Sequence, residues 1–208
     1  MIVTVSAYKG GVGKTTTAMH LAGAFGYMHV STLLIDRDRV PSAFRWWSKQ
    51  DDWPFHAVKA EDATADVVRH YRESGAIVID TPAAPSPDEL IAFGERSDLV
   101  VVPTTPDVLA IHAVTDTVKE LRAANIPHRV LLTMVPPPPQ KAGAETRAAM
   151  EDAGLPLFEA EVPTAAAFRR AALNGVLVGN VRDRRAALMD WIYDEVAKEI
   201  RDVVGGET

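Results

Sequence analysis

The sequence of 208 residues contains no cysteine. This excludes disulfide bonds, thiolate zinc sites, cysteine nucleophiles and cysteine-held iron–sulfur clusters. It also lacks any run of about 18 apolar residues, so no segment is expected to span a membrane. The first residues, MIVTVSAYKGG, lack a basic segment followed by an apolar core, and we expect no signal peptide. These absences fit a cytoplasmic protein.

Neither the composition nor the charge is extreme. The hydrophobic fraction is 47% and the charged fraction 24%, close to globular averages, so a hydrophobic core is expected. The length suits a single domain, and we predict one domain over residues 1–208. The net charge of −6 argues against a nucleic-acid-binding protein of the usual basic kind. Positive charge is concentrated in residues 165–185, which contain Arg169, Arg170, Arg182, Arg184 and Arg185.

Short apolar segments alternate with helical ones along the chain. Strands are expected at residues 2–6, 30–36, 55–58, 76–80, 98–102, 129–135 and 157–162. Helices are expected from the glycine-rich stretch to about residue 27, and at 42–49, 63–73, 107–124, 144–153 and 182–203. Continuous apolar strands are typical of a parallel sheet buried on both faces. We therefore predict a doubly wound α/β domain, with a mostly parallel sheet and helices on both faces.

The strongest motif is KGGVGKTT at residues 9–16, which follows the first strand and opens the first helix. Glycines let the backbone curl, and the helix N-terminus adds unpaired N–H groups and partial positive charge. In this arrangement Lys14 can reach the β- and γ-phosphates of ATP, Thr15 can bind Mg²⁺ and Thr16 can hydrogen-bond the α-phosphate. The residues expected to bind the phosphates are Gly10, Gly11, Val12, Gly13, Lys14, Thr15 and Thr16.

Acidic residues follow two of the expected strands. Asp36 and Asp38 lie in LLIDRDR, and Asp80 ends AIVID. The C-terminal ends of parallel strands are well placed to hold a metal ion and to orient water for phosphoryl transfer. A turn or helix-capping role is the alternative for each acid. The six histidines show no paired spacing typical of metal ligands, and we interpret them as structural or surface residues.

The loop differs from the ordinary Walker pattern, because Tyr8 replaces its first glycine and Lys9 precedes the remaining glycines. KGGVGKTT, with this extra lysine, resembles the deviant Walker A loop of the ParA/MinD ATPases, which have the P-loop NTPase fold. The resemblance implies an ATPase that uses ATP and Mg²⁺ and dimerises around the nucleotide, with Lys9 reaching the partner's nucleotide. The charge argument agrees, since a second cation near the γ-phosphate stabilises the transition state much as an arginine finger does.

The same resemblance assigns roles to the acids. It implies that Asp38 orients the attacking water, that Asp36 supports the metal shell and that Asp80 holds Mg²⁺ through water. Residues 39–41, Arg-Val-Pro, replace the Pro-Gln that commonly follows the second acid. We call residues 36–41, which match the family's switch I segment, the switch segment. Its conformation, or the rate of ATP hydrolysis, is therefore expected to differ from that of the family.

Two later segments also resemble the family. Residues 102–106 match a V-P-T-x-P stretch after a core strand, and residues 162–169 match a segment that lies near the adenine. Met134 and Pro163 are therefore candidate adenine contacts, with core packing as the alternative.

The resemblance implies a partition ATPase of the short ParA type, with no helix-turn-helix domain ahead of the loop. Such a protein dimerises on ATP, binds DNA nonspecifically, associates with the nucleoid in that state and is stimulated by a ParB-like partner, segregating a plasmid or chromosome. The five arginines of residues 165–185 are candidate contacts to the DNA backbone, with a solvated surface as the alternative. Positioning of another cargo, such as a protein compartment or receptor cluster, is an alternative function for the same core.

A MinD-like membrane switch is a further alternative. The last helix carries an acidic face, which anionic lipid repels, and we expect the helix to pack on the domain and not to bind a membrane. Its expected apolar stripe consists of Leu188, Ile192, Val196 and Ile200. A cluster of aromatic residues after the switch segment is expected to pack on the sheet edge, with a partner-binding surface as the alternative: Phe44, Trp46, Trp47 and Trp53.

Overall fold

A parallel sheet forms the centre of the molecule. The computed structural model describes the backbone of residues 1–206 and the side chains of all of these except 108 and 109; residues 207–208 of the predicted domain lie outside it. Within this range six strands pair in the order β3-β2-β4-β1-β5-β6, and every pair is parallel. The strands are β1 (Ile2–Val5), β2 (Ser31–Asp36), β3 (His56–Lys59), β4 (Gly75–Asp80), β5 (Leu99–Thr104) and β6 (His128–Leu132).

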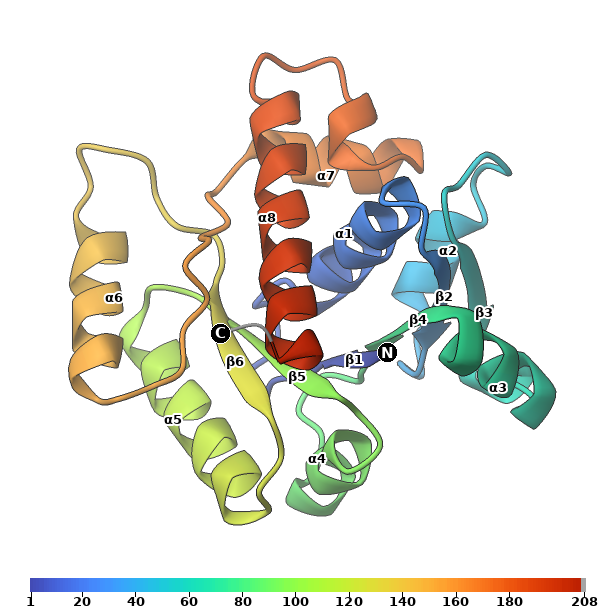
Figure 1. Cartoon of the computed structure of the whole chain (residues 1–208). Helices are drawn as coiled ribbons and strands as arrows, with labels where there is room; N and C mark the ends of the chain where they lie inside the picture. Colours follow the sequence, from blue (N-terminus) through green and yellow to red (C-terminus); the bar gives the residue numbers. More distant parts are fainter. Residues whose placement is uncertain (207–208) are drawn as a thin grey trace.

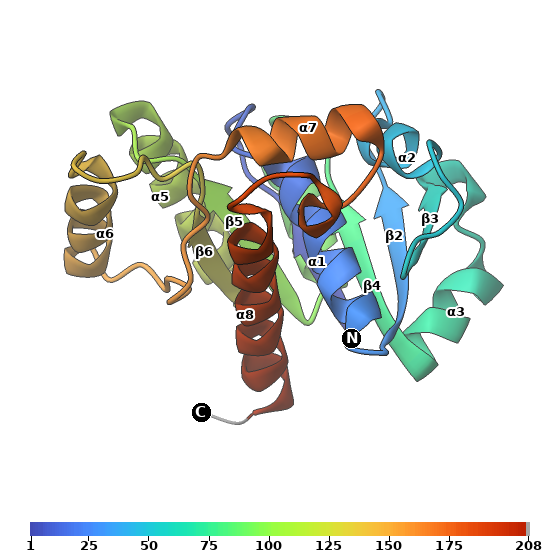
Figure 2. The ribbon, with the colours of Figure 1, turned by 90° about the horizontal axis from the view of Figure 1, so that it is seen from above.

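Helices cover both faces of this sheet. The helices are α1 (Lys14–Tyr27), α2 (Ser42–Trp47), α3 (Ala65–Ser74), α4 (Pro87–Gly94), α5 (Val108–Ala123), α6 (Ala142–Asp152), α7 (Ala166–Asn174) and α8 (Ala186–Gly205), with short 3-10 helices η1 (Ala60–Asp62) and η2 (Val178–Asn180). Side chains of α1, α2, α7 and α8 share one core cluster with the sheet, and those of α3, α4 and α5 pack on the opposite face. Figure 1 shows α1 and α7 on one side of the sheet and α4 and α5 on the other. Figure 2, turned by 90°, shows α6 beyond the β6 edge.

Strand burial explains why the pattern predicted this architecture. Val3 and Val5 of β1 pack in the cluster with α1, whereas Ile2 packs on the opposite face with Ile77. Because successive side chains of a strand point to opposite faces, a strand covered on both sides is apolar throughout. The predicted doubly wound α/β fold is therefore confirmed.

The predicted strand at residues 157–162 is wrong. Leu157 forms an isolated bridge to Val130 of β6, and Pro163, just after the segment, forms one to Val135, beyond the end of β6. Between them the backbone N–H groups of Glu159 and Ala160 donate to the carboxylate of Glu199, at 2.9 and 3.0 Å. Since these two N–H groups are satisfied by a side chain of α8, the ladder to β6 is interrupted there.

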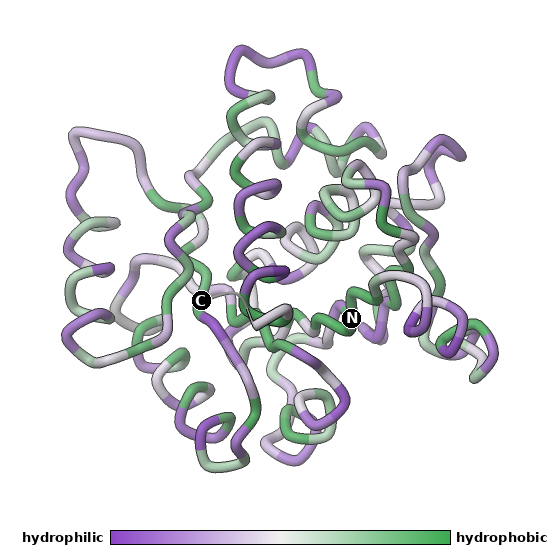
Figure 3. Tube along the Cα trace, in the orientation of Figure 1, coloured by the Kyte–Doolittle hydropathy of each residue, from purple (hydrophilic) through white to green (hydrophobic). Residues whose placement is uncertain are grey.

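The last helix packs on the domain as predicted, but its buried stripe differs. Ile192, Val196 and Ile200 are buried, whereas Leu188 is 51% exposed and the stripe instead begins with Ala186 and Met189. Figure 3 shows hydrophobic and hydrophilic residues alternating along α8, as expected for a helix with one buried face. Within residues 1–206 no helix combines the length and the apolar character needed to cross a membrane.

The three tryptophans of the aromatic cluster after the switch segment pack against the core, as predicted, whereas Phe44 is half-buried and outside it. Trp46 is 5% exposed, and its indole N–H donates to the carbonyl of Val176 at 3.1 Å. The indole N–H of Trp47 donates to the carbonyl of Phe55, just before β3. Both tryptophans therefore join α2 to neighbouring segments of the domain.

Candidate functional site

The glycine-rich loop connects β1 to α1 in a conformation suited to anions. Gly11 and Gly13 have φ angles of 76° and 86°, in the left-handed region that favours glycine. Gly13 is the N-cap of α1, and no side chain caps this end of the helix. The first N–H groups of α1 and the positive end of its dipole are therefore available to a bound anion.

Lys14 is held beneath this loop. Its side chain is buried, and its Nζ donates to the carbonyls of Lys9 at 3.2 Å and of Ala7 at 3.4 Å. Burial lowers the pKa of the ammonium, while the nearby carboxylates of Asp80 and Asp38 oppose this effect. The loop thus presents a cation that is held by backbone carbonyls and has two acids of the same site nearby.

A cavity of about 330 Å³ opens beside the loop. We call it the loop cavity. It is lined by Gly11, Gly13, Lys14, Thr15, Thr16, Asp38, Thr81, Ala83 and Met134. Most of the residues predicted to bind phosphates, and the acid predicted to orient water, therefore share one cavity.

Asp80 lies at the end of β4 with its carboxylate fully buried. Among the described residues no group makes a well-formed hydrogen bond to either carboxylate oxygen, although the Thr15 hydroxyl lies nearby. Burial raises the pKa of the group to about 7, opposed first by Thr15 and then by Lys14. A buried carboxylate without partners is costly unless a cation compensates it.

The donor set around Asp80 fits Mg²⁺. Within residues 1–206 no three acidic or histidine side chains gather into a cluster that could hold a metal ion. Mg²⁺ in nucleotide sites typically takes one or two protein oxygens, with phosphates and water completing the shell. The Asp80 carboxylate and the hydroxyl of Thr15, which lines the loop cavity, are such a pair.

The two acids after β2 have different surroundings. The carboxylate of Asp36, which is 1% exposed, accepts the backbone N–H groups of Asp38 and Phe44, each at 3.0 Å. Asp38 lines the loop cavity, and one of its oxygens accepts the N–H of Val40 at 3.0 Å. Asp36 thus holds the switch segment against α2, and its predicted role in the metal shell stays a prediction.

The Lys9 side chain forms an ion pair with Asp107 of the same chain. Its Nζ lies 2.7 and 2.8 Å from the two carboxylate oxygens of Asp107, which also accepts the hydroxyl of Thr105 and the N–H of Ala110 at the start of α5. Hydrogen bonds from Lys9 and Thr105 lower the pKa of Asp107 to about 2. The predicted role of Lys9 toward a partner's nucleotide would require this ion pair to open.

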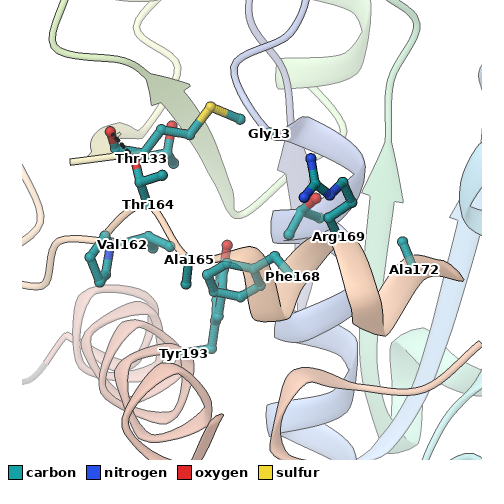
Figure 4. A pocket seen from close by; sticks show the side chains of 12 residues that line it. Gly13, Thr133, Val162, Thr164, Ala165, Phe168, Arg169, Ala172 and Tyr193 are labelled. Atoms are coloured by element: carbon teal, nitrogen blue, oxygen red, sulfur yellow. Dashed lines mark hydrogen bonds between the residues drawn. The ribbon is translucent and has the colours of Figure 1, made fainter. Parts of the chain in front are cut away.

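A second cavity, of about 280 Å³, adjoins the first and is mostly apolar. We call it the apolar cavity (Figure 4). It shares Gly13, Thr16 and Met134 with the loop cavity, so the two meet at the start of α1. Both candidate adenine contacts, Met134 and Pro163, lie in its wall. Its remaining lining residues are Thr133, Val162, Thr164, Ala165, Phe168, Arg169, Ala172 and Tyr193.

Met134 stands at the junction of the two cavities. It has a φ of 53°, which is uncommon for a residue other than glycine, and Thr164 donates a hydrogen bond to its carbonyl at 2.8 Å. The buried hydroxyl of Thr133 lies 2.9 Å from the carbonyl of Val12 and 3.0 Å from that of Thr104. Thr133 thus fastens the loop to the end of β5, a contact that no local sequence pattern indicates.

His20, on α1, is a further buried residue beside the site. Its Nε2 accepts the N–H of Val178 at 3.1 Å, so Nδ1 carries the proton and donates to the carbonyl of Thr16 at 2.7 Å. The ring stacks on Tyr193 with centroids 4.9 Å apart and meets Phe168 edge-on at 5.2 Å. His20 therefore joins α1 to the wall of the apolar cavity, in agreement with the predicted structural role of the histidines.

The arginines of residues 165–185 have separate neighbours. Arg169 lines the apolar cavity, and Arg170 forms an ion pair with Asp183. Arg184 and Arg185 line a different hollow at the start of α7. All of these arginines, and Arg182, are exposed, and their contact with DNA stays a prediction.

Known proteins resemble this chain along most of its length. Residues 3–178 match the CobQ/CobB/MinD/ParA nucleotide binding domain. The chain is 34% identical over 203 residues to maintenance of carboxysome distribution protein A of Gloeobacter kilaueensis, covering 96% of this chain and 93% of that protein.

Solved structures share the fold at low identity. Apo McdA of Cyanothece has a TM-score of 0.76 at 15% identity, covering 96% of this chain and 98% of its own. The septum site-determining protein MinD of Pyrococcus horikoshii, complexed with Mg-ADP, has a TM-score of 0.75 at 17% identity, covering 100% and 98%. At these identities the similarity concerns the fold.

Proposed function

The chain belongs to the CobQ/CobB/MinD/ParA nucleotide-binding family, and from this premise we propose that it is a ParA/MinD-type ATPase that positions a protein compartment in the cell. The observation that carries the proposal is the 34% identity to a carboxysome distribution protein along 96% of the chain. Of the functions considered from the sequence, this similarity favours positioning of a cargo over partition of a plasmid or chromosome.

The two joined cavities suit the two halves of ATP. The apolar cavity would take the adenosine, and the loop cavity the triphosphate, with the phosphates over the start of α1. Lys14 would bind the β- and γ-phosphates. Thr15 and Asp80 would hold Mg²⁺, which when bound supplies positive charge to the β- and γ-phosphate oxygens.

Asp38 is the proposed group that orients water for hydrolysis. It lies in the wall of the loop cavity, and the N–H of Val40 fixes its carboxylate. Asp36 acts behind it by holding the backbone of Asp38 in place. In this proposal the Asp38 carboxylate would face the phosphates and would not be a ligand of Mg²⁺.

We further propose that ATP-bound chains dimerise through the face that carries the loop cavity, with Lys9 transferred from Asp107 to the partner's nucleotide. An adaptor protein on the cargo would stimulate hydrolysis and thereby release the dimer. Nonspecific DNA would serve as the surface on which the ATP-bound form is retained, through exposed arginines such as Arg182, Arg184 and Arg185.

The proposal is tested in cells that lack this chain and carry a fluorescent shell protein of their compartments. We expect the compartments to cluster, and the wild-type chain, but not its Asp38→Ala variant, to restore even spacing. Retention of resident plasmids should be unchanged. Loss of a plasmid with normally spaced compartments would contradict the proposal and favour partition.

A further inference from the structure

Arg169 differs in its surroundings from Arg170, the next residue of α7. Its side chain extends from α7 and lines the apolar cavity, and in Figure 4 the guanidinium points toward the start of α1, on the side where Gly13 lies. Within residues 1–206 it forms no ion pair or hydrogen bond, whereas Arg170 is paired with Asp183. Arg169 is thus a cation directed at a cavity and without a protein acceptor in the described part of the chain.

The rest of the apolar cavity offers little to a charged ligand. Arg169 is the only charged side chain among the described residues that line it. The hydroxyls of Thr133 and Thr164 are bonded to backbone carbonyls, and that of Tyr193 lies 3.2 Å from the hydroxyl of Thr17. Among the described side chains that line the cavity, the hydrogen-bond donors without a protein acceptor are therefore the guanidinium of Arg169 and the hydroxyl of Thr16.

Thr16 defines what lies opposite this cation. It lines both cavities, so a nucleotide that spans them must pass it at the junction. With the adenosine in one cavity and the β- and γ-phosphates at Lys14 in the other, the group at the junction is the α-phosphate. A guanidinium has only donors and matches the oxygens of a phosphate in a planar, bidentate geometry.

We propose that Arg169 binds the α-phosphate of the nucleotide and is not part of a DNA-binding surface. This inference rests on the proposed binding of ATP. Because ADP and ATP share the α-phosphate, Arg169 supports both equally and contributes affinity without distinguishing the two states. The ion-paired Arg170, one residue further along α7, provides a matched control.

The test measures ADP and ATP affinity of the full-length chain by calorimetry. Arg169→Ala should weaken both by the same factor, about tenfold, as expected for loss of a charge-assisted hydrogen bond to an anion. Arg169→Lys should recover part of the loss, and Arg170→Ala should bind like the wild type. Thermal melting verifies that each variant is folded; if Arg169→Ala is not, Arg169→Gln replaces it.

Several outcomes would overturn the inference. Unchanged ADP affinity in Arg169→Ala would exclude the α-phosphate contact, and a loss confined to ATP would place the guanidinium at the γ-phosphate. An equal weakening of adenosine binding, measured by competition, would assign it to the nucleoside. Loss of DNA retention at unchanged nucleotide affinity would return Arg169 to a DNA-binding role. Failure of the wild type to bind any nucleotide would instead refute the proposed function itself.

Discussion

Replacing His20 should change how the stability of the protein depends on pH. His20 is buried, and burial lowers its pKa from 6.5 to about 4, although its bond to the Thr16 carbonyl opposes the shift. Tyr193, stacked on the ring, has a pKa raised by burial and stays uncharged across the range considered. The folded state therefore keeps the imidazole neutral where the unfolded chain binds a proton.

The direction in which the free energy of unfolding changes with pH depends on whether the folded or the unfolded state binds the proton first. Above pH 6.5 His20 is neutral in both states, and its contribution to stability is complete. As the pH falls from 6.5 toward about 4, the unfolded state gains the proton first, and about 1.4 kcal/mol of unfolding free energy is lost per pH unit. Between pH 7.5 and pH 5 this amounts to about 2 kcal/mol.

Urea denaturation of the wild type and of His20→Gln at pH 7.5 and pH 5 measures the effect. Other groups also titrate in this range, but they cancel in the difference between the two proteins. The wild type should lose about 2 kcal/mol more than the variant on acidification. The variant His70→Gln, which replaces an exposed histidine, is the control and should retain the pH dependence of the wild type.

An equal pH dependence in wild type and His20→Gln would refute the reasoning. If the variant does not fold, the wild type alone provides the test, because the NMR shifts of the His20 ring should not titrate above pH 5. A midpoint near pH 6.5 would show that the ring is protonated in the folded state.

Three further predictions concern two residues of the loop cavity, Lys14 and Asp38, and the partner of Lys9, Asp107. Lys14→Ala should reduce ATP affinity at least about hundredfold by calorimetry, because it removes the buried cation of the site; wild-type affinity would contradict its role. Asp38→Ala should slow phosphate release at least about hundredfold while ATP affinity stays nearly constant, and normal turnover would exclude Asp38 as the water-orienting group. Asp107→Ala should lower the free energy of unfolding in urea by about 1 kcal/mol, because α5 loses its N-cap. Asp107→Ser, which keeps a capping oxygen but loses the pair with Lys9, should restore most of that loss.

Much of the fold was predictable because its signals are local. Strands buried on both faces are continuously apolar, and a phosphate-binding glycine-rich loop is expected between a strand and a helix. The helix α4 carried a local signal that the prediction missed, since Ser86 and Glu89 form a reciprocal capping box with Pro87 between them. The false strand at residues 157–162 has a different cause. Its interruption depends on Glu199, forty residues away, which no local pattern contains.

The sequence indicated which residues belong to the glycine-rich loop, but not their contacts with distant segments of the chain. The loop placed Lys14 and Thr15 through its own geometry, because their positions follow from the turn into α1. The partner of Lys9 could not be foreseen, since Asp107 comes from another segment 98 residues further on. The arginines were grouped by sequence, but a helix and a loop direct them to different neighbours. The five arginines are close in sequence, but they do not share one set of neighbours in the structure.

Two charged groups near the loop, the Asp80 carboxylate and the Lys9–Asp107 ion pair, differ in how strongly each would respond to a bound nucleotide. The buried carboxylate of Asp80 is compensated only in part, by the nearby Thr15 hydroxyl and Lys14, so a bound cation would be stabilised there. The ion pair of Lys9 and Asp107 is different, because the two side chains are 30% and 46% exposed and water screens them. Exposed pairs typically contribute about 0.2–1 kcal/mol, whereas micromolar binding of a nucleotide releases about 8 kcal/mol. Opening this pair is therefore a small cost beside binding, so the pair restrains Lys9 but is weak enough to allow the transfer that we propose.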